Sequence, residues 1–324
     1  VLFAFWQTRR RSYFALCTRY FSTFVTEEGS MTHDGIFDEV NDAKVDMAHL
    51  YDQADPRAYC RELKKFDYKI PSVAKPVFKK LISCMRRYRK GTICLLDLGC
   101  SYGVNAALLK HDLSITDLYN HWGQQKLVSA TPTEIMDYDQ RFFGHLSKAS
   151  DIEVIGLDVA DKAVSFAEEV GLLDDALSIN LENETLTDAA KAKLRTVDLV
   201  MSTGCVGYIT ETSFDKLLSA FRGQKPWIAN FVLRVFPFDV IEKTLKQYGY
   251  VTEKLDGKTF VQRKCGTNEE RSQMLGKLRQ RRIEPMEKEI DGYLLAEFYI
   301  SRPKSDALMD PLSGLLTARE MQDA

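Results

Sequence analysis

The stretch that decides the fold is Asp97-Leu98-Gly99-Cys100-Ser101-Tyr102-Gly103, and it follows the apolar run Ile93-Cys94-Leu95-Leu96. A buried strand that ends in an acid and then turns through two glycines leaves backbone N–H groups open at the start of the next helix. A side chain at Gly99 or Gly103 would keep a nucleotide-like ligand away from this backbone. An ordinary strand-to-helix turn can have the same local pattern, so the glycine pair alone leaves both interpretations open.

Three further apolar runs follow, each of a length that suits a strand. Residues 153–158 end in an acid and precede a helix-like pattern of apolar residues over 160–170. A carboxylate at this place can accept hydrogen bonds from both hydroxyls of a ribose. The third run, 176–182, ends where a side chain could flank an adenine. The fourth run, 197–203, leads into a loop with two glycines over 204–208.

In this order, the four elements resemble the class I, Rossmann-like S-adenosylmethionine-dependent methyltransferases of the small-molecule type, over roughly residues 92 to 302. The resemblance implies an α/β fold with a seven-stranded, mostly parallel, doubly wound sheet and an antiparallel C-terminal edge strand. It also implies a helical N-terminal extension and an inserted cap. The runs 259–263 and 293–300 suit the antiparallel pair that closes such a sheet.

The resemblance also implies S-adenosyl-L-methionine as the cofactor. Its methionine part is expected at Asp97, Gly99 and Gly103, its ribose at Asp158, and its adenine beside Leu181 and Glu182. The full set of expected cofactor-binding residues is Asp97, Gly99, Cys100, Ser101, Gly103, Asp158, Val159, Leu181, Glu182, Thr203 and Gly204. Asp158 lies much further along the chain than the roughly 20 residues that separate loop and acid in dinucleotide folds. The intervening segment is therefore read as an insertion.

A nicotinamide-dependent dehydrogenase would use the same kind of sheet. Its fingerprint needs a middle glycine, whereas residues 99–103 read Gly-Cys-Ser-Tyr-Gly. The acid Asp97 would also repel a pyrophosphate, while it suits the zwitterionic tail of an amino acid. The pattern favours a methyltransferase over a dehydrogenase.

Composition limits the partners. The 324 residues carry 44 Lys and Arg against 46 Asp and Glu, so the basic excess that nucleic-acid binding usually needs is missing and nucleic acid is an unlikely substrate. No apolar run approaches the roughly 18 residues of a membrane span. Seven cysteines without a Cys-x-x-Cys pair and five scattered histidines predict no metal site. We expect a small-molecule substrate, no membrane partner and a possible homodimer.

The chain divides into four expected parts. Residues 1–30 are Arg-rich, free of acids before Glu27, and are read as a transit-like or artefactual segment. Residues 31–90 form a helical cap, which either folds over the cofactor or docks on the sheet for stability. Residues 91–302 are the methyltransferase domain, with an aromatic insertion over 111–149, and 303–324 are a tail. The expected location is cytoplasmic, or mitochondrial or plastid if the first part is a genuine transit segment.

The expected reaction is methyl transfer to an oxygen or nitrogen of a small molecule, by in-line displacement with the protein mainly positioning the substrate. Family members that methylate adenine amines or glutamine amides carry an acid or Asn followed by two prolines after the fourth strand, and this chain does not. Cys205 lacks the preceding proline of the cytosine C5 enzymes. The candidate catalytic residues are Tyr208, in the loop after the fourth strand, and His121, from the insertion. Methylation of protein or RNA, or a catalytically silent Rossmann-like partner subunit, are the alternatives.

Overall fold

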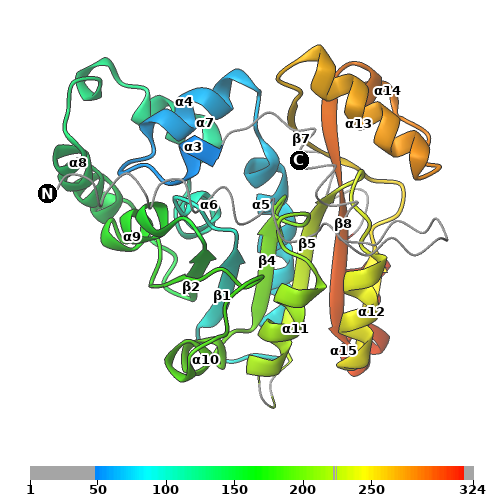
Figure 1. Ribbon diagram of the computed structural model, residues 1–324. Coiled ribbons are helices and arrows are strands. Elements are labelled where there is room, and N and C mark those ends of the chain that lie inside the picture. The colour runs from blue at the N-terminus through cyan, green and yellow to red at the C-terminus, as the bar shows by residue number, and fades with distance from the viewer. Residues whose placement is uncertain (1–47, 222, 224, 317–324) are drawn as a thin grey trace, which may run out of the picture. The chain divides into compact units, whose positions relative to one another are not determined.

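The computed structural model describes residues 48–221, 223 and 225–316. The expected transit-like segment 1–30, the first part of the expected cap (31–47) and residues 317–324 of the tail lie outside the described residues. A mostly parallel β-sheet runs through the centre of the described chain, with helices on both of its faces (Figure 1). The fold is of the α/β class, as the sequence predicts.

Seven strands follow the order β3-β2-β1-β4-β5-β8-β6, and an eighth strand, β7, pairs with β8 beside this path. The strands are β1 (Ile93–Leu98), β2 (Ile152–Asp158), β3 (Asp175–Ser178), β4 (Leu199–Thr203), β5 (Trp227–Leu233), β6 (Tyr250–Lys254), β7 (Phe260–Lys264) and β8 (Tyr293–Pro303). Strands β1 to β5 are mutually parallel. The chain proceeds from β1 to β2 and β3 on one side and then returns to β4 and β5 on the other, so the order reverses between β1 and β4. Open α/β sheets bind ligands outside the carboxyl ends of the strands at such a switch point.

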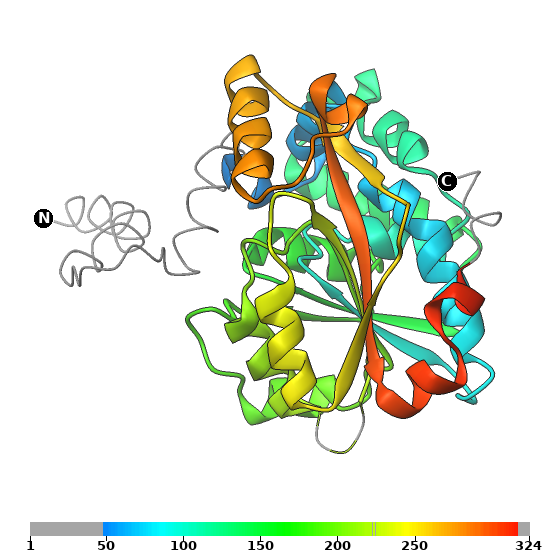
Figure 2. The same cartoon turned by 90° about the vertical axis from the view of Figure 1, so that its right-hand side faces the viewer.

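The antiparallel pairing of β7 with β8 is confirmed, but the order at this end of the sheet differs in detail from the expectation. Strand β6 was not among the expected strands, and β8 lies one place in from the edge. Strand β8 is 11 residues long, so two strands can pair along the side that faces away from β5. One side of β8 pairs with β5, while the other side is shared by β7 along its first residues and β6 along its last. Figure 2 shows β8 as the long orange strand beside these partners.

Helices connect and flank the strands. Their bounds are α3 (Ala48–Tyr51), α4 (Arg57–Lys65), α5 (Ile70–Met85), α6 (Val104–Lys110), α7 (Ile115–Trp122), α8 (Pro132–His145), α9 (Asp161–Glu169), α10 (Asp188–Leu194), α11 (Glu211–Ala220), α12 (Asp239–Gln247), α13 (Asn268–Gln280), α14 (Glu287–Ile290), α15 (Lys304–Met309) and α16 (Leu312–Leu315). Among the described residues, no helix has both the length and the apolar character needed to cross a membrane.

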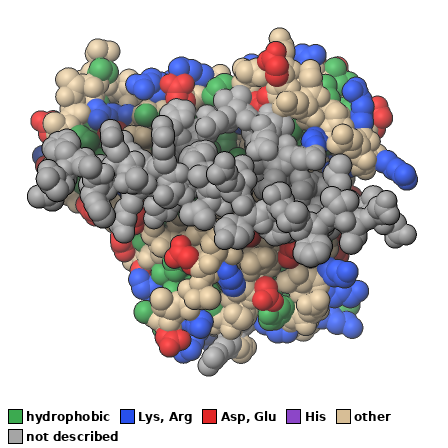
Figure 3. Space-filling view, viewed as in Figure 1, with side chains coloured by type: hydrophobic (Ala, Val, Ile, Leu, Met, Phe, Trp, Pro, Cys, Tyr) green, Lys and Arg blue, Asp and Glu red, His purple; other side chains and the backbone are tan. Residues whose placement is uncertain are grey.

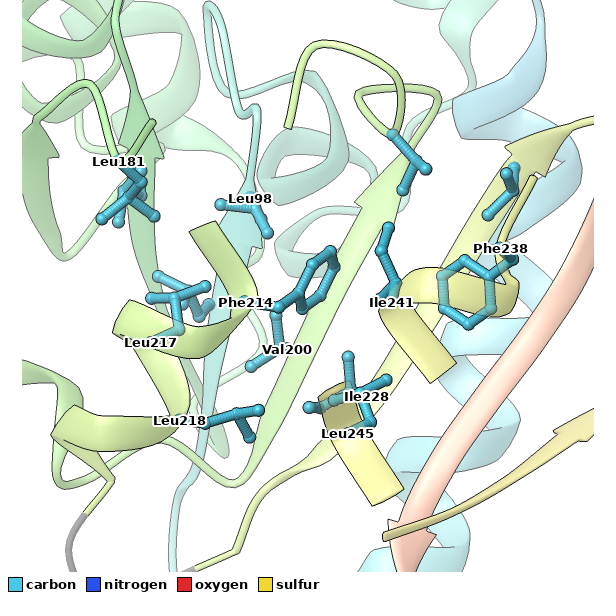
Figure 4. Close-up of a cluster of buried hydrophobic side chains, with 14 of the residues drawn as sticks. Leu98, Leu181, Val200, Phe214, Leu217, Leu218, Ile228, Phe238, Ile241 and Leu245 are labelled. Carbon is cyan, nitrogen blue, oxygen red and sulfur yellow. The ribbon is translucent and has the colours of Figure 1, made fainter. Parts of the chain in front are cut away.

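One face of the sheet is covered by α11 and α12 (Figure 4). Phe214 and Leu217 of α11 and Ile241 of α12 lie in one apolar cluster with Val200 of β4 and Ile228 of β5. Each is at most 1% exposed, and burying a side chain of this size contributes about 1.5–3 kcal/mol. This cluster holds the carboxyl end of β4 in place.

The opposite face is covered by α5, which begins at the Ile70-Pro71 pair that the sequence marks as a break. Phe78 packs edge-to-face against Phe231 of β5, with ring centroids 5.5 Å apart. The described part of the tail also packs on this face, because Leu312 and Leu315 of α16 belong to the buried cluster that contains Phe78 and Phe231.

The insertion expected over 111–149 is helical and packed. It contains α7, α8 and a short 3-10 turn between them, Gln125–Leu127. Ser114 and Thr131 begin the two helices, each in a reciprocal capping box with an acid three residues later. The inner face of this pair joins a third buried cluster with α4 and α9. The aromatic residues of the insertion therefore mainly build a core of their own.

Candidate active site

The candidate site lies where the carboxyl ends of β1, β2 and β4 meet. Asp97, near the end of β1, is in register with Gly156 of β2 and Met201 of β4. Gly156 leaves room for the loop, since a Cβ there would lie 2.8 Å from the Cys100 sulfur. Cys100 is buried, and burial raises the pKa of its thiol well above the ordinary value. Its side chain therefore supports the loop from behind, and only its backbone is available to a ligand.

The loop after β1 has three residues in the left-handed region, Gly99 (φ 75°), Ser101 (φ 47°) and Gly103 (φ 71°). The two glycines have a further reason that the sequence does not reveal. A Cβ on Gly99 would lie 2.7 Å from the Cβ of Cys205, and one on Gly103 would lie 3.1 Å from the Cβ of Ala167. They also allow close approach between neighbouring parts of this same chain.

Asp158, at the end of β2, holds this loop in position. One carboxylate oxygen accepts a hydrogen bond from the backbone N–H of Ser101 at 2.8 Å, and the other accepts one from Ala160 at 3.1 Å. Burial raises the pKa of Asp158, while these backbone donors lower it. An ionised carboxylate has about four acceptor positions, so it can still accept from a hydroxyl group of a ligand. The neighbouring Val159 is 63% exposed at the same edge.

Asp97 is fully buried, and its two oxygens are in different situations. Oδ1 accepts a hydrogen bond from Nδ2 of Asn105 at 2.9 Å, whereas Oδ2 is buried without a hydrogen-bond partner among the described residues. Burial raises the pKa of Asp97 to about 7, and the charge of Asp158 adds to the effect while Asn105 opposes it. The hydroxyl of Ser101 is likewise buried without a partner. Buried polar atoms are nearly always hydrogen-bonded, so two such atoms on one loop indicate a place for a polar ligand.

Asn105 is a site residue that the sequence interpretation missed. Its amide also donates to the hydroxyl of Thr203 at 3.0 Å and so joins the ends of β1 and β4. The available signal was a polar residue early in α6, in a stretch that is otherwise apolar up to Lys110. Its position allows it to hold both Asp97 and Thr203 in fixed orientations.

The loop after β4 closes over the glycine turn. Gly204 has φ 88° and Gly207 has φ 110°. The thiol of Cys205 donates to the carbonyl of Leu98 at 3.2 Å, and burial raises its pKa to about 12. A thiol held in its neutral form is a poor nucleophile, so Cys205 is a packing residue. Tyr208, the expected catalytic residue of this loop, is 59% exposed.

The two residues expected beside an adenine have separate roles in the fold. Leu181 is 2% exposed and belongs to the core under α11. The carboxylate of Glu182 accepts hydrogen bonds from the backbone N–H and the hydroxyl of Thr210, both at 2.8 Å, and from the hydroxyl of Ser213. Glu182 thus anchors the start of α11, and its carboxylate is largely occupied by the chain itself.

His121 requires a correction. The ring is 5% exposed, and its Nε2 lies 2.6 Å from Oδ1 of Asp139 in a hydrogen bond. The ring of Phe142 stacks on it at 3.8 Å, and Trp122 donates to the second oxygen of Asp139 at 2.7 Å. The structure therefore places His121 inside the core of the insertion, and we withdraw the interpretation of His121 as a catalytic base.

The segment from α3 to the start of α5 lies over the glycine loop. The hydroxyl of Tyr102 accepts from the backbone N–H of Gln53 at 2.9 Å and donates to its carbonyl at 3.0 Å. Tyr51 is 37% exposed, yet desolvation raises its pKa to about 12, and Tyr208 and Asp158 raise it further. The hydrogen bonds of Tyr102 join the described part of residues 31–90 to the glycine loop.

Tyr68, at the end of this segment, lies near the buried acid. Burial raises the pKa of Tyr68 well above its ordinary value, and Tyr51, Tyr119 and Asp97 raise it further. The hydroxyl of Tyr119 donates to the backbone carbonyl of Tyr68 at 2.8 Å. Tyr51, Tyr59, Tyr68 and Tyr102 form a tyrosine cluster beside the glycine loop, in which Tyr59 and Tyr102 are part of the buried core.

Sequence comparison finds no family model and no curated protein that matches this chain. The fold is similar to solved structures of S-adenosylmethionine-dependent methyltransferases. Magnesium protoporphyrin IX methyltransferase from Synechocystis, with bound S-adenosylmethionine, is 12% identical with a TM-score of 0.36, over 85% of this chain and 99% of that one. The plantazolicin methyltransferase BpumL, in complex with S-adenosylhomocysteine, is 11% identical with a TM-score of 0.37, over 84% and 96%.

A TehB-like methyltransferase from Corynebacterium glutamicum is 13% identical with a TM-score of 0.32, over 66% of this chain and 83% of that one. At such identities and TM-scores, the function has to be argued from the strand order and the side chains of this chain.

Proposed function

We propose that this protein binds S-adenosyl-L-methionine at the carboxyl ends of β1, β2 and β4 and transfers its methyl group to an oxygen or nitrogen of a small molecule. The observation that carries the proposal is the pair of acids Asp97 and Asp158 on neighbouring strands at the switch point. One oxygen of Asp97 is buried and has no partner in the described part of the chain. A cationic group is the ligand chemistry that such an oxygen favours, because it compensates the buried charge.

The residues present fit this cofactor. Oδ2 of Asp97 would accept from the ammonium of the methionine part, and the remaining acceptor positions of Asp158 would take the ribose hydroxyls. The backbone of residues 99–103 can approach the cofactor closely, because Gly99 and Gly103 carry no side chain and adopt left-handed conformations. Bound there, the cofactor supplies an electrophilic methyl group. The chain itself orients the acceptor and excludes water, for which the tyrosine cluster and Tyr208 are suitably located.

A small acceptor agrees better with the surface than a polymer does. Lys and Arg are interspersed with Asp and Glu on the described part of the face in Figure 3, and the net charge is −2. Nucleic-acid substrates require a basic track along their phosphates. Tyr51 and Tyr208 are 37% and 59% exposed and can supply aromatic surface with hydroxyl groups, which is typical of small-molecule sites.

The direct test is calorimetry with S-adenosylhomocysteine, the demethylated product, supported by its effect on the melting temperature. We expect binding in the micromolar range. Asp97→Asn should lose most of the affinity, and the exposed Asp256→Asn should serve as an unaffected control. No heat and no thermal shift at millimolar ligand would refute the proposal. If the protein binds S-adenosylhomocysteine but forms none of it from S-adenosylmethionine with any acceptor tested, it is a catalytically silent partner subunit.

A further inference from the structure

Gln262 is a buried polar residue that neither the fold nor the proposed cofactor contacts use. It belongs to β7 and is 8% exposed, and its side-chain oxygen Oε1 has no hydrogen-bond partner among the described residues. Its backbone carbonyl accepts from the N–H of Lys69 at 2.9 Å. The unpartnered oxygen costs stability, which indicates that something else pairs with it.

A β-bulge directs this side chain. Val261 pairs with Leu295 of β8 and Arg263 pairs with Leu294, so Gln262 has no partner residue between them. Bulges re-aim a side chain away from the regular alternation of a strand and are over-represented beside active sites. The irregularity is therefore what directs Gln262 toward the carboxyl end of β4.

The amide of Gln262 lies directly over Gly204. A Cβ at that glycine would be 2.3 Å from Nε2 and 3.2 Å from Cδ of Gln262. Gly204 follows Thr203, and Thr203 is connected to Asp97 through the amide of Asn105. The Gln262 side chain thus stands beside the residues that we propose for the methionine end of the cofactor, where an acceptor must enter.

The surroundings limit the charge of the acceptor. Arg263, the cation nearest to Gln262 in the chain, makes a two-pronged ion pair with Glu270 at 2.7 and 3.1 Å and is therefore compensated. With the cofactor bound, Asp97 and Asp158 are engaged by its ammonium and ribose. An anionic acceptor would find Arg263 already paired with Glu270 and only an acceptor oxygen at Gln262, whereas an amine or hydroxyl compound can donate to that oxygen.

Building on the proposed function, we propose that Gln262 is a positioning residue for the methyl acceptor, and that its side-chain oxygen accepts a hydrogen bond from an N–H or O–H group of a small acceptor without negative charge. This defines the substrate class as small amines and hydroxyl compounds, with an apolar part against the tyrosine cluster. Gln262 acts by binding and orientation alone.

The experiment uses the full chain saturated with S-adenosylhomocysteine and two small probes of matched size. Tyramine carries a hydroxyl and an ammonium, and 4-hydroxyphenylacetate carries a hydroxyl and a carboxylate. We expect tyramine to bind and the carboxylate probe to bind at least tenfold more weakly, by calorimetry or ligand-observed NMR. Gln262→Leu should weaken tyramine binding about tenfold, the effect of one lost hydrogen bond. Gln262→Glu, which keeps an acceptor oxygen, should restore it to within about threefold.

Two controls separate this role from a structural one. Both variants should fold, as shown by an unchanged circular dichroism spectrum, and should bind S-adenosylhomocysteine within about twofold of the wild type. The exposed Gln273→Leu on α13 should change neither affinity. Equal tyramine binding by wild type and Gln262→Leu, a preference for the carboxylate probe, or binding of S-adenosylhomocysteine without any tyramine binding would each overturn the inference. Failure of the wild type to bind S-adenosylhomocysteine would instead overturn the proposed function itself.

Discussion

Two buried acids in this molecule, Asp97 and Asp139, have the same exposure and opposite surroundings. Both are 0% exposed. In the insertion, each oxygen of Asp139 has a partner, His121 for one and Trp122 for the other. At the end of β1, one oxygen of Asp97 has a partner, and the other has none among residues 48–221, 223 and 225–316. A buried acid with complete hydrogen bonding stabilises its surroundings, whereas one with an unpartnered oxygen is held ready for a ligand at a cost in stability.

The largest expected effect is on stability, at Asp139. Asp139→Ala removes the shared partner of His121 and Trp122 and should lower the free energy of unfolding by about 3 kcal/mol or more. Urea unfolding followed by circular dichroism measures this, with the exposed Asp137→Ala on the same helix as a control that should change little. A loss below about 1 kcal/mol would mean that the two acids do not differ as described.

The next effect is on affinity, at Asp158. Asp158→Ala should weaken S-adenosylhomocysteine binding by about 1.5–3 kcal/mol, the range of hydrogen bonds to a charged group. The fold should persist, because only two backbone hydrogen bonds of the loop are lost. An unchanged dissociation constant with an unchanged circular dichroism spectrum would assign the ribose to another residue.

The pH dependence of binding sharpens the comparison further. The pKa of Asp97 is raised to about 7, so the carboxyl is protonated in the free protein below that pH. A cationic ligand prefers the ionised form, so affinity should rise with pH as the group ionises. Between pH 6 and pH 7.5 the dissociation constant of S-adenosylhomocysteine should fall roughly eightfold. Asp97→Asn should bind weakly and show no such trend, and a flat wild-type profile would exclude Asp97 as the titrating group.

The smallest expected effect is a gain of stability in the free protein. Because the pKa of Asp97 is higher in the folded than in the unfolded protein, the protein loses stability as the pH rises from about 4 to 7. The full penalty remains above that range. At pH 8, Asp97→Asn removes the buried charge and should raise the free energy of unfolding by about 1 kcal/mol. Marked destabilisation at pH 8 would show that Asp97 is a structural acid like Asp139, and the comparison would fail.

Much of this fold could be predicted from local sequence patterns, because strands that end in an acid or a glycine are recognisable within a short window of residues. The elements β1, β2 and β4 and the glycine loop follow from such windows, and so does the position of Asp158 at the edge of the sheet. Strand β6 was missed, since its sequence Tyr-Val-Thr-Glu-Lys is short and becomes a strand by pairing with the second half of β8.

The α/β order of elements and the acids and glycines at the switch point can therefore be read from the chain alone. Which polar side chains already have partners is visible only in the folded molecule. Glu182 accepts from Thr210 and Ser213, and His121 pairs with Asp139, whereas Asp97 and Gln262 each keep a buried oxygen that has no partner among the described residues. Hydrogen bonding and burial depend on elements far apart in the chain, and a local pattern contains no information about which of them will meet.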